Sequence, residues 1–261
     1  MSNYIFDTHS HYDDKAFDSD RDEILNGLFE KGIGKVVDVG ADMPSSKMAL
    51  ELAKQYEFVY AALGVHPSEV EGLTEDDMAW ISSHAAHEKV AAIGEIGLDY
   101  HWPEPEPELQ KQWFRRQIEL AKEVKLPIIV HSRDAAEPTM QIIQETKAYE
   151  CGGVIHCYSY SPEMAEEYVK MGFFIGMGGV LTFKNAKKLV RCAERIPLSS
   201  IVLETDCPYM APEPNRGKRN DSSQLIYVAQ KLAEIKGITA EEVKQATTEN
   251  AHRLYRLTQN K

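Results

Sequence analysis

Histidine and acidic residues follow short apolar runs at several points of the chain. The first run leads into Asp7-Thr8-His9-Ser10-His11, and further runs lead to His66, Glu95, His131, His156 and Asp206. Imidazole nitrogens and carboxylate oxygens are ligands for divalent cations such as Zn²⁺ and Mn²⁺. A single His-x-His pair is a weak signal, whereas several such residues placed alike indicate a metal centre.

The elements that must position these residues are repeated strand–helix units. Short β-branched runs alternate with amphipathic segments, and the segment 109–125 shows a helical apolar repeat. The predicted strands are Tyr4–His9, Lys35–Gly40, Val59–His66, Val90–Glu95, Pro127–His131, Gly153–His156, Phe173–Gly178 and Ile201–Asp206. Helices are expected between them, and the last one follows a Thr239/Glu242 capping box.

Eight strand–helix units in 261 residues predict an α/β fold of the (β/α)8 TIM barrel class, as one domain over residues 1–261. The competing open doubly wound sheet would carry a glycine-rich loop after its first strand. Here the first strand runs into His9-Ser10-His11 instead, which favours the barrel.

In a barrel the carboxyl ends of the strands converge on one face. Residues two apart on a strand point the same way, so Asp7, His9 and His11 are expected on one side, as are Glu204 and Asp206. Cys157 and Cys207 are then expected to point away as core thiols. Burying four imidazoles and two carboxylates uncompensated would cost several kcal/mol per group, and a pair of divalent cations would compensate it.

Composition and charge limit the classes of function. The chain has 29 Lys and Arg against 41 Asp and Glu, a formal net charge of −12, which disfavours nucleic-acid binding over the whole surface. The stretch Met1–Asp7 lacks the features of a signal peptide, and no apolar run reaches the length of a membrane span. Four cysteines without metal-ribbon spacing fit a reducing compartment. We expect a cytoplasmic protein with no membrane association.

Three stretches carry a resemblance to a known family. The sequence resembles the TatD family of metal-dependent deoxyribonucleases, in the amidohydrolase superfamily, over essentially its whole length. The matching stretches are residues 5–13, 127–135 and 201–208, supported by 64–67, 94–100 and 216–220. After Asn220 the family usually has Glu-Pro, whereas this chain has Asp221-Ser222.

The resemblance implies one metal ion held by His9, His11 and Asp206. It implies a second ion held by His131 and His156, with Glu95 bridging the two. The ligand set suits two divalent cations, and Mg²⁺, Mn²⁺ and Zn²⁺ all remain open.

Two ions about 3.5–4 Å apart can share and activate a hydroxide for in-line displacement. Asp206 is expected to orient or deprotonate that water, Arg133 to clamp a phosphate oxygen, and His66 to bind the same phosphate or the leaving oxygen. Arg133 as half of a surface ion pair and His66 as a loop-ordering residue are the competing interpretations. His84, His87, His101 and His252 are read as non-ligands.

A basic cluster follows the eighth predicted strand and is expected to contact a nucleic-acid backbone. It consists of Arg216, Lys218 and Arg219. The favoured function is hydrolysis of phosphodiester bonds in DNA, as a 3′–5′ exonuclease on single strands, with the polarity taken from the resemblance. RNA stays open as a further partner, and the oligomeric state is not predicted. The alternatives are an ester or amide hydrolase, such as an aminoacyl-tRNA deacylase, and a non-catalytic metal-bound interaction protein.

Overall fold

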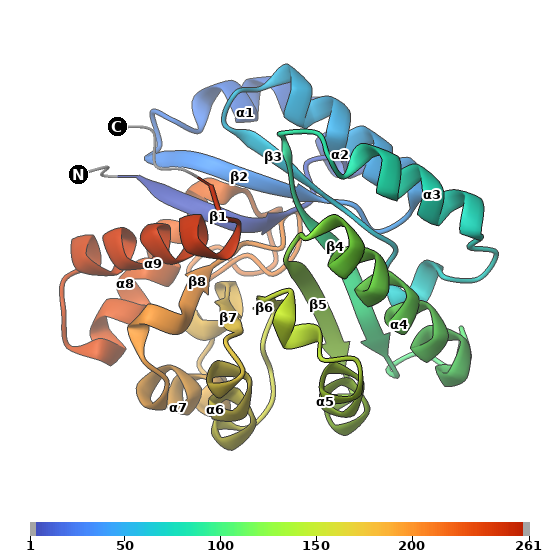
Figure 1. The fold of residues 1–261 in the computed structure, drawn as a ribbon. Helices are drawn as coiled ribbons and strands as arrows, with labels where there is room; N and C mark the ends of the chain where they lie inside the picture. The colour runs from blue at the N-terminus through green and yellow to red at the C-terminus, as the bar shows by residue number, and fades with distance from the viewer. Residues whose placement is uncertain (1–3, 258–261) are drawn as a thin grey trace. The chain divides into compact units, whose positions relative to one another are not determined.

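Strands and helices alternate along residues 4–257, the part of the chain that the computed structural model describes (Figure 1). The strands are β1 (Ile5–Ser10), β2 (Ile33–Val39), β3 (Val59–Leu63), β4 (Val90–Asp99), β5 (Ile128–Arg133), β6 (Gly153–Ile155), β7 (Phe174–Met177) and β8 (Ile201–Leu203). They form one eight-stranded sheet in chain order. Parallel strands alternating with helices in this order are the (β/α)8 class that the sequence predicts.

Helices lie between the strands, as predicted, and two helices follow β8. They are α1 (Arg21–Gly27), α2 (Met43–Gln55), α3 (Glu75–His84), α4 (Pro107–Val124), α5 (Ala136–Glu145), α6 (Pro162–Lys170), α7 (Lys187–Arg195), α8 (Leu225–Lys236) and α9 (Ala240–Leu254). The predicted capping box at Thr239 and Glu242 is present and begins α9. The helix α3 carries a second such box, in which Thr74 and Asp77 cap each other's backbone.

The chain divides into two compact units. The first contains Met1–Val37 and Cys157–Lys261, and the second contains Asp38–His156. The single domain over residues 1–261 stays a prediction. Residues 1–3 of the stretch examined for a signal peptide lie outside the described residues. No helix within residues 4–257 is long and apolar enough to cross a membrane.

Buried strands form the core of both units. Every residue of β1 and every residue of β4 is buried, as expected for parallel strands whose two faces are both covered. Polar side chains in such strands must find partners, because an unsatisfied buried group costs free energy. Asp7, His9, Glu95 and Asp99 are the groups for which this requirement matters most.

Several strand boundaries differ from the prediction and move site residues. The strand β3 ends at Leu63 rather than His66, so His66 lies beyond it at the start of a short helical turn. The strand β4 continues to Asp99, so Glu95 lies inside the strand rather than at its end. The strand β8 ends at Leu203, so Asp206 lies in the following loop with φ 57°. The prediction of a strand over Ile201–Asp206 was therefore wrong at its end. The reason is that the amides of Thr205 and Asp206 bond to the carbonyl of His9 instead of continuing a regular strand.

Candidate metal centres

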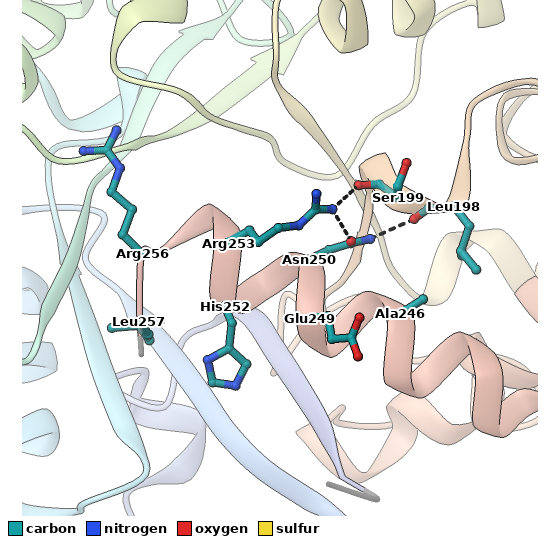
Figure 2. Close-up of a pocket in the computed structure, with 9 residues that line it drawn as sticks. All are labelled: Leu198, Ser199, Ala246, Glu249, Asn250, His252, Arg253, Arg256 and Leu257. Carbon is teal, nitrogen blue, oxygen red and sulfur yellow. Dashed lines mark hydrogen bonds between the residues drawn. The ribbon is translucent and has the colours of Figure 1, made fainter. Parts of the chain in front are cut away.

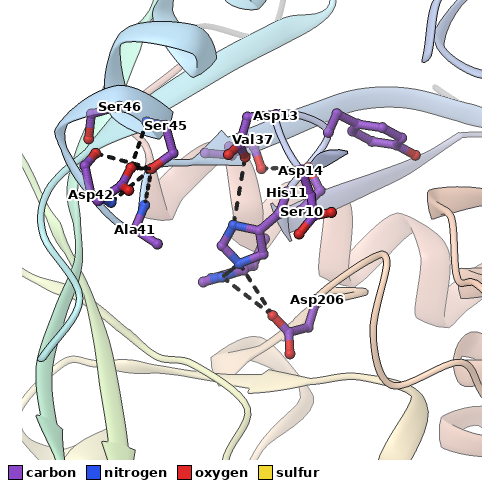
Figure 3. A network of polar contacts seen from close by, with 12 residues as sticks. Ser10, His11, Asp13, Asp14, Val37, Ala41, Asp42, Ser45, Ser46 and Asp206 are labelled. Atoms are coloured by element: carbon purple, nitrogen blue, oxygen red, sulfur yellow. Dashed lines mark hydrogen bonds and ion pairs between the residues drawn. The ribbon is translucent and has the colours of Figure 1, made fainter. Parts of the chain in front are cut away.

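His9, His11 and Asp206 come together in the first unit. The Nε2 atoms of His9 and His11 are 3.0 Å apart, and Asp206 Oδ1 is 3.8 Å from the first and 3.4 Å from the second. Figure 3 shows the His11 ring and the Asp206 carboxylate turned toward one another. His9 is fully buried, whereas His11 and Asp206 keep some exposure to solvent, so the triad is accessible from outside.

The spacing of these three atoms fits a common cation. Ligand atoms about 2.0–2.2 Å from a tetrahedral ion lie roughly 3.3–3.6 Å from one another. The three observed separations of 3.0, 3.4 and 3.8 Å fall around this range. The residues present therefore fit a divalent cation held by two nitrogens and one oxygen.

Backbone hydrogen bonds fix the two segments that carry the triad. The amide of Asp206 donates to the carbonyl of His9 at 2.9 Å, and the amide of His11 donates to the carbonyl of Cys207 at 2.9 Å. Ser10 and Cys207 also form a parallel bridge. The loop after β8 is thereby held against β1, which sets the distance from Asp206 to both histidines.

The buried carboxylate of Asp7 supports this connection between β1 and the loop after β8. Asp7 accepts hydrogen bonds at Oδ1 from the amides of His9 and Thr205, and at Oδ2 from the hydroxyls of Thr205 and Ser222. Burial raises the pKa of Asp7 to about 7, while these hydrogen bonds act in the opposite direction. Asp7 shares the side of β1 predicted for it, but its carboxylate is engaged by the protein.

A second cluster forms in the second unit around Glu95. Its Oε1 atom lies 2.8 Å from His131 Nδ1, 3.8 Å from His156 Nε2 and 3.9 Å from His66 Nε2. Glu95 and His156 are both buried. One carboxylate oxygen facing three imidazoles is a donor set that also fits a divalent cation.

His131 lies between two carboxylates in this cluster. Its Nδ1 bonds to Glu95, and its Nε2 lies 3.1 Å from Asp99 Oδ2. Burial alone lowers the pKa of His131, but the hydrogen bonds with Asp99 and Glu95 outweigh it, so the pKa is raised overall. Burial acts to raise the pKa of Asp99, yet the contacts with His131 and the His101 amide lower it overall. A cation here must compete with a proton on His131.

Asp99 is the site residue that the sequence reasoning missed. It lies four positions after Glu95 on the same strand, and its carboxylate groups with His66 and His131 as candidate metal ligands. Even spacing along a strand places side chains on one face, so the interval from Glu95 to Asp99 is a usable signal.

His66 follows β3 and begins the short 3-10 helix η2 (Pro67–Glu69). Its Nδ1 accepts a hydrogen bond from the Ser68 amide, which is the loop-ordering role considered above. An acceptor Nδ1 leaves the ring proton on Nε2, which lies on the side of Glu95. His66 is thus arranged to donate a hydrogen bond from Nε2.

Arg133, the last residue of β5, has an exposed side chain. Within residues 4–257 the structure records no ion pair for it, and the neighbouring Asp134 contacts His101 at 3.2 Å. The guanidinium is therefore available to an anion from solvent. Its role toward phosphate stays a prediction.

The predicted basic cluster is exposed, and each of its three side chains also has a contact within the protein. Arg219 forms a double hydrogen bond with the Asp20 carboxylate and also donates to the carbonyl of Ala16. Arg216 stacks on the ring of Phe183 at 4.2 Å, and Lys218 contacts Asn215. Contact of this cluster with nucleic acid stays a prediction.

Glu204, Cys157 and Cys207 lie close to predicted metal ligands in the sequence. Glu204 is buried, and its Oε1 accepts the amide hydrogen of Cys157 at 2.6 Å, so it supports a backbone group. Cys207 is buried as predicted, whereas Cys157 is only partly buried with φ 43°, so its assignment as a core thiol was wrong. The turn after His156 holds Cys157 in this conformation.

A cavity of about 740 Å³ lies beside α9 and contains none of the predicted ligands (Figure 2). It is lined by Leu198, Ser199, Ala246, Glu249, Asn250, His252, Arg253, Arg256 and Leu257. Arg253 donates to the Ser199 carbonyl and to Asn250, so its charge holds the helix to the segment before β8. Burial lowers the pKa of His252.

The resemblance implies that Glu95 bridges two ions. Such a bridge would join ligands of both units, and it stays a prediction. In the first unit the structure brings His9, His11 and Asp206 within reach of one ion. In the second unit His131 and His156 both face the Glu95 carboxylate, while the atoms close enough together for one ion belong to His66, Asp99 and His131.

Known proteins match the chain over nearly its full length. The family described as TatD related DNase matches residues 6–256. The metal-dependent hydrolase YabD of Bacillus subtilis, which is described as uncharacterized, is 47% identical over 97% of this chain and 99% of its own. The similarly described YcfH of Escherichia coli is 34% identical over 97% of this chain and 96% of its own.

A solved structure confirms the fold class. The crystal structure of YjjV, a TatD homologue from Escherichia coli K12, superposes with a TM-score of 0.92 at 32% identity, covering 99% of this chain and 100% of that one. A phosphotriesterase homology protein from Escherichia coli, at 15% identity and a TM-score of 0.70, shares the fold. With its whole-length match and its two imidazole–carboxylate clusters, the chain belongs to the TatD family of metal-dependent hydrolases.

Proposed function

We propose that the protein is a metal-dependent deoxyribonuclease that removes nucleotides from the 3′ end of single-stranded DNA. The observation that carries the proposal is the triad of His9, His11 and Asp206, whose donor atoms have the spacing of ligands to one ion. The description of the matching family as a DNase supports the choice of substrate.

Each of the two units supplies the ligands of one cation. His9, His11 and Asp206 hold one divalent cation, and Glu95, His131 and His156 are assigned to a second, with Mg²⁺, Mn²⁺ or Zn²⁺ as candidates. Bound cations would supply a water of lowered pKa and neutralise charge that develops on the phosphate.

Other side chains would bind and orient the substrate. Arg133 has a planar guanidinium that is exposed and suited to hold two phosphate oxygens. His66 would donate its Nε2 proton to the phosphate or to the leaving oxygen, because its Nδ1 is already occupied by Ser68. Asp206, whose carboxylate remains partly exposed, would accept a proton from the attacking water.

The net charge of −12 is compatible with this activity when binding is local. An acidic surface disfavours long contacts with a polyanion, whereas contact with one strand end needs few positive charges. We therefore expect an enzyme that binds DNA weakly and releases it readily.

A cleavage panel tests the proposal. The metal-loaded protein is incubated with single- and double-stranded DNA, RNA, a simple phosphodiester and an aminoacyl ester. A 5′-labelled single strand should give a ladder that shortens from the 3′ end. Asp206→Ala should abolish this cleavage, whereas Asp18→Ala, which removes the same charge from an exposed site, should leave it intact.

Two results would contradict the proposal. Cleavage of the aminoacyl ester with no cleavage of any phosphodiester would assign the alternative ester hydrolase function. No turnover of any substrate, with cations bound, would favour a non-catalytic interaction protein.

A further inference from the structure

Asp7 is a buried acidic group that the proposed reaction does not use. Its side chain is fully buried, so it reaches neither solvent nor substrate. Both of its oxygens accept two hydrogen bonds each, from His9, Thr205 and Ser222. An ionised carboxylate has no proton to donate and can accept four hydrogen bonds. In each of the four bonds the neighbouring group is therefore the donor.

These bonds connect both chain segments that carry the metal triad. One oxygen of Asp7 holds the amide of His9, and both oxygens hold Thr205, the residue directly before Asp206. Metal ligands must keep their distances to within a few tenths of an ångström. A small rotation of the Asp7 carboxylate would therefore move His9 relative to Asp206.

Ser222 holds one oxygen of this carboxylate. It begins the 3-10 helix η6 (Ser222–Gln224), and its hydroxyl donates to Asp7 Oδ2 at 2.6 Å. The Ser222 amide donates to the Tyr12 hydroxyl at 3.0 Å, and the two hydroxyls lie 2.8 Å apart. Since the Ser222 proton is used on Asp7, the Tyr12 hydroxyl must be the donor between them.

Both Tyr12 and Ser222 are fully buried. Their hydroxyls face one another, and the Ser222 hydroxyl also faces Asp7.

We propose that Ser222 is a positioning residue for the cation site of His9, His11 and Asp206, acting through Asp7. The inference rests on the proposed metal binding. The Tyr12–Ser222–Asp7 relay fixes the backbone of His9 and Thr205, and this presets the spacing of the ligand atoms before an ion arrives.

The test measures affinity for Zn²⁺ alone, by calorimetry on the full-length, metal-free protein. Asp206→Ala identifies which binding event belongs to the triad. Ser222→Ala should weaken that event by about tenfold to a hundredfold, the usual effect of removing a residue that orients metal ligands. Ser222→Thr, which keeps the hydroxyl, should restore most of the affinity.

Ser223→Ala is the matched control. This neighbouring serine is less buried, and its recorded bond to Asp221 uses only the backbone amide. Its substitution should leave Zn²⁺ affinity within about twofold of the wild type. Tyr12→Phe, which removes the donor to Ser222 while keeping the ring, should weaken binding less than Ser222→Ala does.

The outcomes separate the inference from the function on which it rests. A wild type that binds no Zn²⁺ at the triad overturns both. Wild-type binding that Ser222→Ala and Tyr12→Phe leave unchanged overturns the inference alone, even if Ser222→Ala lowers the unfolding temperature. If Ser222→Ala does not fold, Tyr12→Phe decides the question by the same measurement.

Discussion

Gly97 lies opposite His131 in the pairing of β4 with β5, and its replacement by alanine tests how the cluster around Glu95 is built. The glycine has φ 150°, a conformation that residues with a side chain rarely adopt. An alanine Cβ would lie 1.9 Å from the carbonyl oxygen of His131. This atom belongs to the backbone of a buried strand, so it has no side-chain freedom to move away.

The size of the effect follows from these contacts. Relieving the overlap requires the strands to separate by about 1 Å, because real Cβ contacts are not shorter than 3.0 Å. Overpacking costs about 1–3 kcal/mol, and the unfavourable φ costs a further 1–3 kcal/mol. We therefore expect Gly97→Ala to lower the free energy of unfolding by about 2–6 kcal/mol. The same shift would lengthen the 2.8 Å contact between His131 and Glu95.

Urea unfolding of the metal-free protein measures the loss of unfolding free energy. Calorimetry with Zn²⁺ measures how the longer contact between His131 and Glu95 affects cation binding. Gly72→Ala is the matched control, since Gly72 also has positive φ, at 85°, but open space at its Cβ. The control should lose only about 1 kcal/mol. Equal destabilisation by both substitutions, together with unchanged cation binding at the Glu95 cluster, would refute the reasoning.

Two further predictions concern charge. Arg216→Ala should reduce the salt dependence of single-strand binding by a slope of about 0.7, the value expected for one lost phosphate contact. Arg219→Ala should reduce it by less, because Asp20 already pairs with Arg219. A larger reduction for Arg219→Ala, in titrations at several salt concentrations, would contradict this. Burial lowers the pKa of His252 below its usual 6.5, so the unfolded chain takes up a proton before the native chain as pH falls. The unfolding free energy of the wild type should thus fall more between about pH 7.5 and about pH 5.5 than that of His252→Gln, and parallel losses would show the sign to be wrong.

The fold class was accessible from the sequence because it depends on a repeating pattern, whereas the candidate ligand set came from the resemblance to a known family. Apolar runs of strand length fixed the position of His131 and His156 to within one or two residues of a strand end. The period of two along β1 placed Asp7 and His9 on one side.

Other features depend on contacts that no local pattern contains. Asp206 leaves the strand geometry because its amide bonds to His9, almost two hundred positions away in the chain. Arg219 reads as a free cation in the sequence, yet Asp20 pairs with it across a similar interval. Asp99 was missed because β4 runs past Glu95, and strand ends are the least certain part of a prediction.

The central claim is that the two clusters hold divalent cations. An anomalous difference map from a crystal soaked in Mn²⁺ tests it most directly. We expect one peak about 2.0–2.3 Å from His9 Nε2, His11 Nε2 and the Asp206 carboxylate, and a second beside Glu95, His131 and His156. A map with no peak at the triad, in a crystal that binds Mn²⁺ elsewhere, would contradict it.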